Sequence, residues 1–451
     1  MVIAVVCACG DSKNAPVDTD AAVPDDGVTA DAFEPDVPLP GHVDVYLLGI
    51  IPEVGTRVVF AAPDNTLIAD VVTDASGKAS AAMDAGYVTI VRPFPGTATA
   101  KIVTTIMGVK AGDSLKISSS AGQVNTVPPK ATVNIPAGDD VTGWLHAPCV
   151  AQNAGIGVAN PMDVDPEIRC RQNVGILARL HTPTDQFTYL GAQNLVAGTT
   201  YTLPAWQPTA STTYTLAVPA TARFRFGASQ YVLSDLGAYY TDDGALSNTT
   251  GGVTSLTATF DRPTIGDGLM YAGRMYRTDD TALGFQHVMH RAPAAATATI
   301  DIGARLARWF YQPAVQNSPP RMLYPTSGTD GAASATIGWL SFHYFSSGTS
   351  VRWEILDGGL PANGAYNFPK PPIGDLAFDG SDTVNTGVSP RVSVLTFTGG
   401  ITYDELRPTI ANEIDFTSHR IDSHYAIHQT AYYLMRAHAN ITSMQFSTSP
   451  E

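Results

Sequence analysis

The sequence predicts an all-β fold, with tandem antiparallel β-sandwich domains behind a disordered, acidic N-terminal tether. Short runs of alternating apolar and polar residues, bounded by Gly, Pro, Asn and Asp, recur along the chain and indicate strands. Only 15% of the residues are charged, which is low for a cytosolic globular protein, and Thr, Ser, Gly, Ala and Pro are abundant instead. The tether leaves about 410 residues, enough for roughly three domains.

The N-terminus is a short apolar run, MVIAVVCACGDS, that contains two cysteines. Cys9 has a small residue at position −1 and Val6 at −3, whereas Cys7 would have a branched residue at −1. This pattern resembles the lipobox of bacterial lipoproteins, which implies that 1–9 is a signal remnant and that Cys9 carries acyl chains. A signal needs a basic n-region and ~7–15 apolar residues, so we interpret Met1 as a start placed too late. A fortuitous apolar N-terminus, such as a buried strand, is the alternative.

Residues 10–41 have the composition of a disordered tether. They hold eight acidic residues against Lys13, nearly half of the chain's net charge of −15, together with five prolines. Proline interrupts helices and central strands. Phe33 is the one aromatic residue, so the segment cannot bury enough apolar surface to offset chain ordering. A flexible coil of this length spans ~30 Å, and full extension approaches ~110 Å. A calcium-binding acidic tract is the alternative, although the ligand spacing of such a loop is absent.

The segment 42–119 shows the clearest strand pattern. Its six strand-like runs are 43–48, 57–60, 66–72, 78–83, 87–91 and 100–105. Residues 73–78 predict a hairpin turn in which Asp74 caps the backbone and Gly77 adopts positive φ. The motif order VVFxxPD, TDxxGK and AGY resembles the carboxypeptidase-regulatory-like, transthyretin-type sandwich. That resemblance implies a structural accessory domain, with a smaller core layer at Ala79, where the family often has an aromatic residue.

The next segment, 120–225, is expected to be a β-sandwich with one disulfide. Cys149 and Cys170 are the only cysteines after the N-terminal pair. Outside the cytoplasm an isolated pair predicts a disulfide, which would stabilise the fold by ~3 kcal/mol in the chain-entropy account. Two unpaired buried thiols are the alternative. A metal site is disfavoured, because two cysteines without a CxxC motif supply too few ligands.

The last two segments are a β-rich domain, 226–320, and a sandwich-like domain, 321–451, with an ambiguous C-terminal tail. In the latter, 336–345 and 351–356 predict a hairpin around an SSGTS turn. These strands resemble those of fibronectin-III or immunoglobulin-like sandwiches only in length and spacing.

The second strand of that hairpin, VRWEIL, predicts one buried and one solvated face. Its apolar residues, among them Trp353, alternate with Arg352 and Glu354. Trp353 and the neighbouring Trp339 are therefore predicted core residues, with a sugar-stacking platform as the alternative.

The chain contains no GxSxG elbow, HExxH zinc motif, P-loop or GxGxxG fingerprint. We therefore assign no catalytic residue and no cofactor. The candidate metal ligands are His424 and His428, which would share a helix face, and His438 nearby. Surface or strand histidines are the alternative, as for the other close pair, His287 and His290.

The absence of a basic cluster argues against nucleic-acid binding. The leading prediction is a membrane-anchored bacterial lipoprotein of the cell envelope with a non-catalytic structural or binding role, in adhesion or ligand capture. Its partners would be the membrane, through the N-terminal lipid, and a surface protein or glycan. The alternative is a secreted hydrolase with its catalytic region in 230–451, which uses carboxylates or a histidine-bound metal.

Overall fold

The computed structural model describes a defined part of the chain. The described ranges are 41–48, 52–94, 97, 99–118, 131–136, 143–146, 154–155, 162–164, 174–180, 186–196, 198–218, 220, 223–234, 237–265, 268–280, 282–293, 295–301, 308–328, 335–413 and 441–450. Several sequence predictions lie outside them: the tether, the lipidated Cys9, the disulfide between Cys149 and Cys170, and the candidate ligands His424, His428 and His438.

The described residues confirm the predicted all-β class. Their helical elements are α1 (Tyr403–Glu413) and the short 3₁₀ helix η3 (Gly374–Leu376), and the rest of their regular structure is strand.

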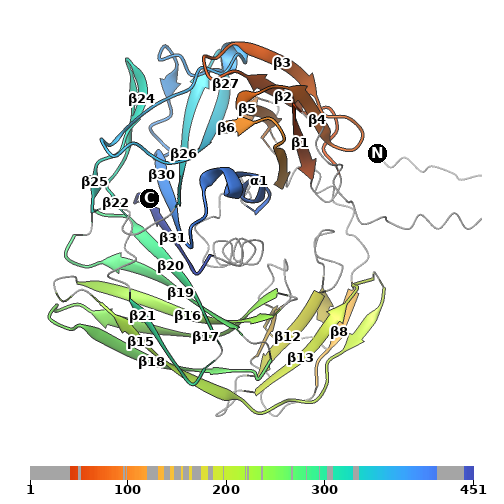
Figure 1. The fold of residues 1–451 in the computed structure, drawn as a ribbon, viewed down its shortest axis with the longest axis vertical. Helices are drawn as coiled ribbons and strands as arrows, with labels where there is room; N and C mark the ends of the chain where they lie inside the picture. Colours follow the sequence, from red (N-terminus) through yellow and green to blue (C-terminus); the bar gives the residue numbers. More distant parts are fainter. Residues whose placement is uncertain are drawn as a thin grey trace, which may run out of the picture. The chain divides into compact units, whose positions relative to one another are not determined.

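One long sheet contains thirteen strands, and these come from both ends and the middle of the described chain (Figure 1). In spatial order its strands are β17 (Gly237–Asn248), β16 (Phe224–Ser234), β19 (Gly268–Arg277), β20 (Phe285–Pro293), β31 (Ser443–Thr448), β30 (Arg391–Thr398), β26 (Ala335–Ser346), β27 (Thr349–Asp357), β6 (Ala100–Lys110), β5 (Ala85–Pro93), β2 (Arg57–Ala61) and β3 (Leu67–Val72), with β29 (Thr383–Val384) paired to β26 beside this path.

Six smaller sheets complete the described structure. They are β4 (Lys78–Ala82), β1 (His42–Leu48) and β7 (Ser114–Ser118); β10 (Ala154–Gly155), β9 (Gly143–His146), β12 (Val174–Leu180) and β13 (Gln186–Gln193); β11 (Met162–Val164), β8 (Ala131–Asn134) and β14 (Thr200–Thr202); β18 (Ser255–Arg262), β15 (Ala210–Ala217) and β21 (Thr297–Asp301); β22 (Trp309–Phe310) and β25 (Thr326–Ser327); and β23 (Ala314–Asn317), β24 (Pro320–Leu323) and β28 (Ala365–Asn367).

The strands of the first segment form two facing sheets, here called the first sandwich. The sheet β4-β1-β7 and the sheet part β6-β5-β2-β3 share one core that contains Val45, Phe60 and Ile90. In the turn between β3 and β4, Asp74 Oδ1 accepts hydrogen bonds from backbone N–H groups two and four residues later, at 2.8 and 3.0 Å. Gly77 has φ +76°, so the predicted turn chemistry is confirmed.

The first sandwich is continuous with the C-terminal part of the chain, because β6 pairs in parallel with β27. Trp353 Nε1 donates a hydrogen bond to Thr105 Oγ1 across this pairing at 3.0 Å, in a buried position. β31 then inserts between β20 and β30, so strand pairing runs across the segment boundaries that the sequence suggested. Edge strands are a liability for a sheet, and this continuity covers the β6 edge.

The hairpin of β26 and β27 has its predicted strands, but the prediction of a solvated face is wrong. Trp353 is fully buried, as expected for a core residue, yet Glu354 is also 0% exposed and Arg352 only 4% exposed. One face of β27 packs into an aromatic core with Tyr344 and Phe368. Its other face adjoins the first-sandwich core, to which Trp339 also belongs. β27 is a central strand with neighbours on both faces, which sequence alternation alone does not reveal.

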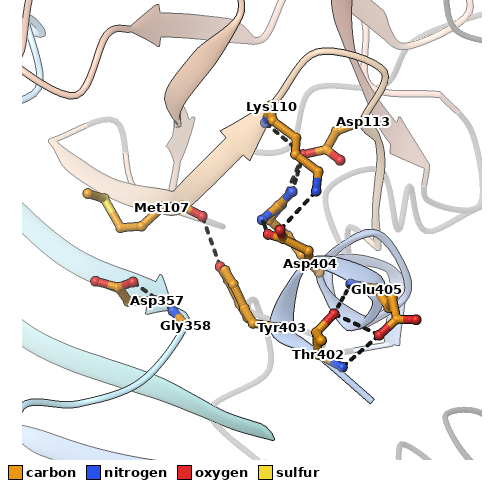
Figure 2. Close-up of polar contacts among 10 residues, drawn as sticks. Met107, Lys110, Asp113, Asp357, Gly358, Thr402, Tyr403, Asp404 and Glu405 are labelled. Carbon is orange, nitrogen blue, oxygen red and sulfur yellow. Dashed lines mark hydrogen bonds and ion pairs between the residues drawn. The ribbon is translucent and has the colours of Figure 1, made fainter. Parts of the chain in front are cut away.

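Helix α1 ties the C-terminal part of the chain to the first sandwich (Figure 2). A capping box starts it, because Glu405 Oε2 accepts from the Thr402 backbone N–H at 2.7 Å and Thr402 Oγ1 accepts from the Glu405 N–H at 3.4 Å. Tyr403 Oη donates to the Met107 carbonyl of β6 at 2.9 Å. The helix contains Pro408 and is eleven residues long.

Candidate functional site

The candidate site is a cavity of about 300 Å³ on the face of the long sheet that adjoins the first-sandwich core. Strands β26, β27 and β30 and the loop between β29 and β30 provide its walls. The lining residues are Trp339, Ser341, His343, Arg352, Val388, Ser389, Arg391 and Ser393.

A break in strand pairing produces the cavity. β29 pairs with β26 at Val384, and β30 pairs with the same strand again from Arg391 onward. Between these points the chain leaves the sheet in a turn, in which the Gly387 N–H donates to Asn385 Oδ1 at 3.0 Å. The loop that results places Val388 and the serine after it against the sheet face. One wall of the cavity is therefore loop, and the others are regular strands.

The cavity has a closed end and an open end, as exposure along β26 shows. Trp339 is buried, Ser341 and His343 are half-buried, and Phe345 on the same face is 44% exposed. The pattern repeats on β30, where Ser393 is buried and the next residue on that face toward the loop is half-buried. Small ligands can therefore enter from the hairpin end of β26 and reach buried side chains.

The strand register places charged and polar groups in two adjacent rows across the same sheet face. One row runs through Arg391, Ser341, Glu354 and Thr104. The next contains His343 and Arg352 and, beyond the apolar Ile102, Arg92. Side chains of paired residues lie on the same face of a sheet and contact one another. A polar band therefore crosses β30, β26, β27, β6 and β5 beneath the first sandwich.

Buried ion pairs hold this band together. Arg352 Nη2 contacts Glu354 Oε1, and both side chains are almost fully buried. Further along the band Arg92 Nη1 lies 3.9 Å from Glu53 Oε1, also in a buried position. Burial raises the pKa of Glu53, and the Arg92 charge opposes that rise. Buried charges need such partners, because removal from water costs each of them several kcal/mol.

The described lining is cationic and rich in hydroxyl groups. It includes Arg352, Arg391 and His343 with three serines, and it includes no Asp or Glu. Guanidinium groups bind carboxylates and phosphates through paired N–H donors. The arrangement suits recognition of an anion, whereas glycoside hydrolysis by the usual route needs two carboxylates across the substrate.

Most residues singled out in the sequence play no part in this cavity. His287 and His290 are three positions apart on β20, so they lie on opposite faces of the sheet and do not form one ligand pair. His287 is buried beside the rings of Phe285 and Phe446. Among the described residues, no group of three or more His, Cys, Asp or Glu side chains is placed to hold a metal ion.

Sequence reasoning missed the cavity because its residues belong to different strands and a loop. The one local signal was the pair Arg352 and Glu354 in an otherwise apolar strand. Because charged and apolar residues alternate there, the pattern predicted that both charges face solvent. Their burial depends on β6 and the first sandwich, which come from the opposite end of the sequence.

In the part of the chain that the structure describes, no helix has the length and apolar character needed to span a membrane.

Comparisons with known proteins give no family for this chain. No family model matches it, and no curated protein matches it. Among solved structures it has a distant likeness to a DUF3823 family protein from Bacteroides ovatus, at 13% identity over 57% of this chain and 98% of that chain, with a TM-score of 0.14. The TIE protein of Bacillus anthracis gives 10% identity over 58% of this chain and 49% of that chain, with a TM-score of 0.14.

A tetra-tandem repeat from the extending region of a large adhesion protein gives 8% identity over 79% of this chain and 95% of that chain, with a TM-score of 0.13. TM-scores at this level assign neither a fold family nor a function.

Proposed function

We propose that this chain is a lipoprotein of the bacterial cell envelope whose β-sheet part binds a ligand and carries out no catalysis. The observation that carries the binding role is the cavity, with its arginines, histidine and serines on a buried sheet face. Rigid strands hold most of these side chains, and binding constellations on strands are held more precisely than those on loops.

The anchoring part of the proposal rests on the sequence. Cys9 with its small and branched neighbours supports lipid attachment, and acyl chains add ~0.8 kcal/mol of membrane affinity per buried methylene. The acidic tether at 10–41 would hold the folded part ~30 to ~110 Å from the membrane. Such a spacing gives the cavity access to a surface protein or glycan.

The hydrolase alternative receives no support from the described site. Catalysis by paired carboxylates would require two acidic side chains converging on one cavity. The described lining has none, and its single histidine, His343, has no second histidine in the lining. Binding is the activity that this lining favours.

Anchoring is tested by fractionation of cells that express the gene from its own locus. Cys9→Ser should move the protein from the membrane to the soluble fraction, and globomycin should block processing of the unsubstituted protein. Cys7→Ser is the matched control and should leave the protein in the membrane. Membrane retention of the Cys9 variant, with processing insensitive to globomycin, would overturn the anchoring proposal.

A further inference from the structure

The charge of the cavity contrasts with that of the chain. The whole chain has a net charge of −15, yet the described lining contains two arginines, a histidine and no acidic residue. Arg352 forms an ion pair with the buried Glu354. Arg391 lies on a different strand and is half-buried. The cavity is therefore a local cationic site on an acidic protein.

The donors of the cavity suit an anion with a planar, two-oxygen head. A guanidinium presents N–H groups in a fixed fork that matches a carboxylate, and partial burial strengthens such charge-assisted hydrogen bonds. Arg391 is the more exposed of the two arginines, since it is half-buried whereas Arg352 is only 4% exposed. His343 lies on the neighbouring strand next to Arg352 in register.

The rest of the lining suits a ring that carries hydroxyl groups. Ser341, Ser389 and Ser393 can each donate and accept a hydrogen bond. Trp339 and Val388 add apolar surface against which the carbon face of a ring can pack. The volume of about 300 Å³ is at the lower end of the range for small-ligand sites, and it suits a single sugar residue better than an extended chain.

We propose that the cavity binds an acidic sugar residue, with its carboxylate toward Arg391 and its hydroxyl groups toward the serines. This inference rests on the binding role proposed above and names the class of ligand for it. The carboxylate of the ligand would bind the arginine, its hydroxyl groups would hydrogen-bond to the serines, and its ring would pack against the tryptophan.

The test is a calorimetric or NMR titration of the purified full chain, kept free of lipid by Cys9→Ser. D-Glucuronate should bind, and D-glucose, which has the same ring without the carboxylate, should bind about tenfold or more weakly. Arg391→Gln should weaken glucuronate binding by about tenfold or more. Arg57→Gln is the matched control, because Arg57 pairs with Asp70 at the far end of the sheet, and it should bind as the unsubstituted chain does.

Arg352 is unsuitable for this test, because its removal breaks the buried ion pair with Glu354. Ser389→Ala on the cavity loop is the second variant, and it should weaken both sugars because it removes a hydroxyl contact. Circular dichroism of each variant checks that the β fold is retained.

Three outcomes would overturn the inference. Equal binding of glucose and glucuronate would exclude recognition of the carboxylate. Equal binding of inorganic phosphate and glucuronate would mean an anion site without sugar recognition. Unchanged glucuronate binding by Arg391→Gln would place the ligand elsewhere.

The anchoring result is independent of this titration. Failure of glucuronate to bind, with Cys9-dependent membrane retention intact, would reject the ligand class alone. Sugar binding by a protein that does not need Cys9 for membrane retention would reject the anchor alone.

Discussion

Arg407 of helix α1 donates from Nη2 to Asp113 Oδ2 at 2.6 Å, and 294 residues of sequence separate the two. Arg407 Nε donates to the same oxygen at 2.9 Å. The arginine is 0% exposed and the aspartate nearly so. This buried pair joins the C-terminal helix to the loop before β7 in the first sandwich, next to the tyrosine contact of Figure 2.

Arg407→Gln should therefore destabilise the fold strongly. It would leave Asp113 buried without its cation, and the loss of one partner from a buried pair typically costs about 3–5 kcal/mol. Urea unfolding followed by circular dichroism measures the change. Lys110→Gln is the control: Lys110 pairs with Asp404 at 2.8 Å at an exposed site, and its loss should cost below about 1 kcal/mol. Similar losses of unfolding free energy for the two variants would show that the buried pair contributes no more to stability than the exposed pair.

Asp357 should make the fold less stable as pH rises. Burial raises the pKa of Asp357, although hydrogen bonds from Tyr366 and the Gly358 N–H oppose the rise. Because the unfolded chain then gives up this proton first, stability falls as pH rises from about 3.8 through the higher folded pKa. Asp357→Asn removes the charge, so its Tm relative to the unsubstituted chain should increase between pH 3.5 and 7.

Asp74→Asn is the control, because its effect on stability should change with pH in the opposite direction. The Ser76 hydroxyl and the Lys78 backbone N–H lower the pKa of Asp74. Its charge stabilises the fold above about 3.8, and that contribution is lost as pH falls through the folded pKa. The Tm of this variant relative to the unsubstituted chain should therefore be lowest near neutral pH. Parallel pH profiles for the two variants would contradict the assignment of Asp357 as a destabilised carboxylate.

The hydrogen bond from Trp353 to Thr105 should stabilise the junction between β27 and β6. Trp353→Phe removes the donor, and Thr105→Val removes the acceptor, which also contacts the Thr89 hydroxyl at 3.0 Å. Each variant should cost about 1–3 kcal/mol, since it leaves a buried polar group without one of its partners. The double variant should lose about 1 kcal/mol less unfolding free energy than the sum of the losses of the two single variants. Strict additivity would mean that this bond contributes nothing to the junction.

Residues 42–118 should not fold as a soluble monomer on their own. Isolation removes β27 and exposes the edge of β6, including Ile102 and Val103, which are buried in the whole chain. An uncovered apolar edge promotes association. Size-exclusion chromatography and circular dichroism should show aggregation or lost β structure, while the full chain with Cys9→Ser stays monomeric and folded. A folded monomer of 42–118 would contradict the structural role of the β6–β27 pairing.

Local residue patterns predicted the strands and turns closely. The hairpin at 73–78 followed from Asp74 and Gly77, because those two residue types satisfy the backbone of a turn directly. The burial of Trp353 followed from its apolar neighbours at alternate positions. The burial of Arg352 could not be predicted in this way, since alternation specifies that two faces differ but not what covers each face.

Local sequence patterns predicted that this chain is built from strands and where several of its turns lie, and they revealed a cysteine motif and an acidic tract before the folded part. Those features depend on residues close together in the chain. The folded structure was needed to show that β6 pairs with β27, that Arg407 contacts Asp113, and that three strands and a loop enclose a cationic cavity. Pairing between distant strands depends on which edges and apolar faces meet in the folded chain, and a local residue pattern does not predict which ones meet.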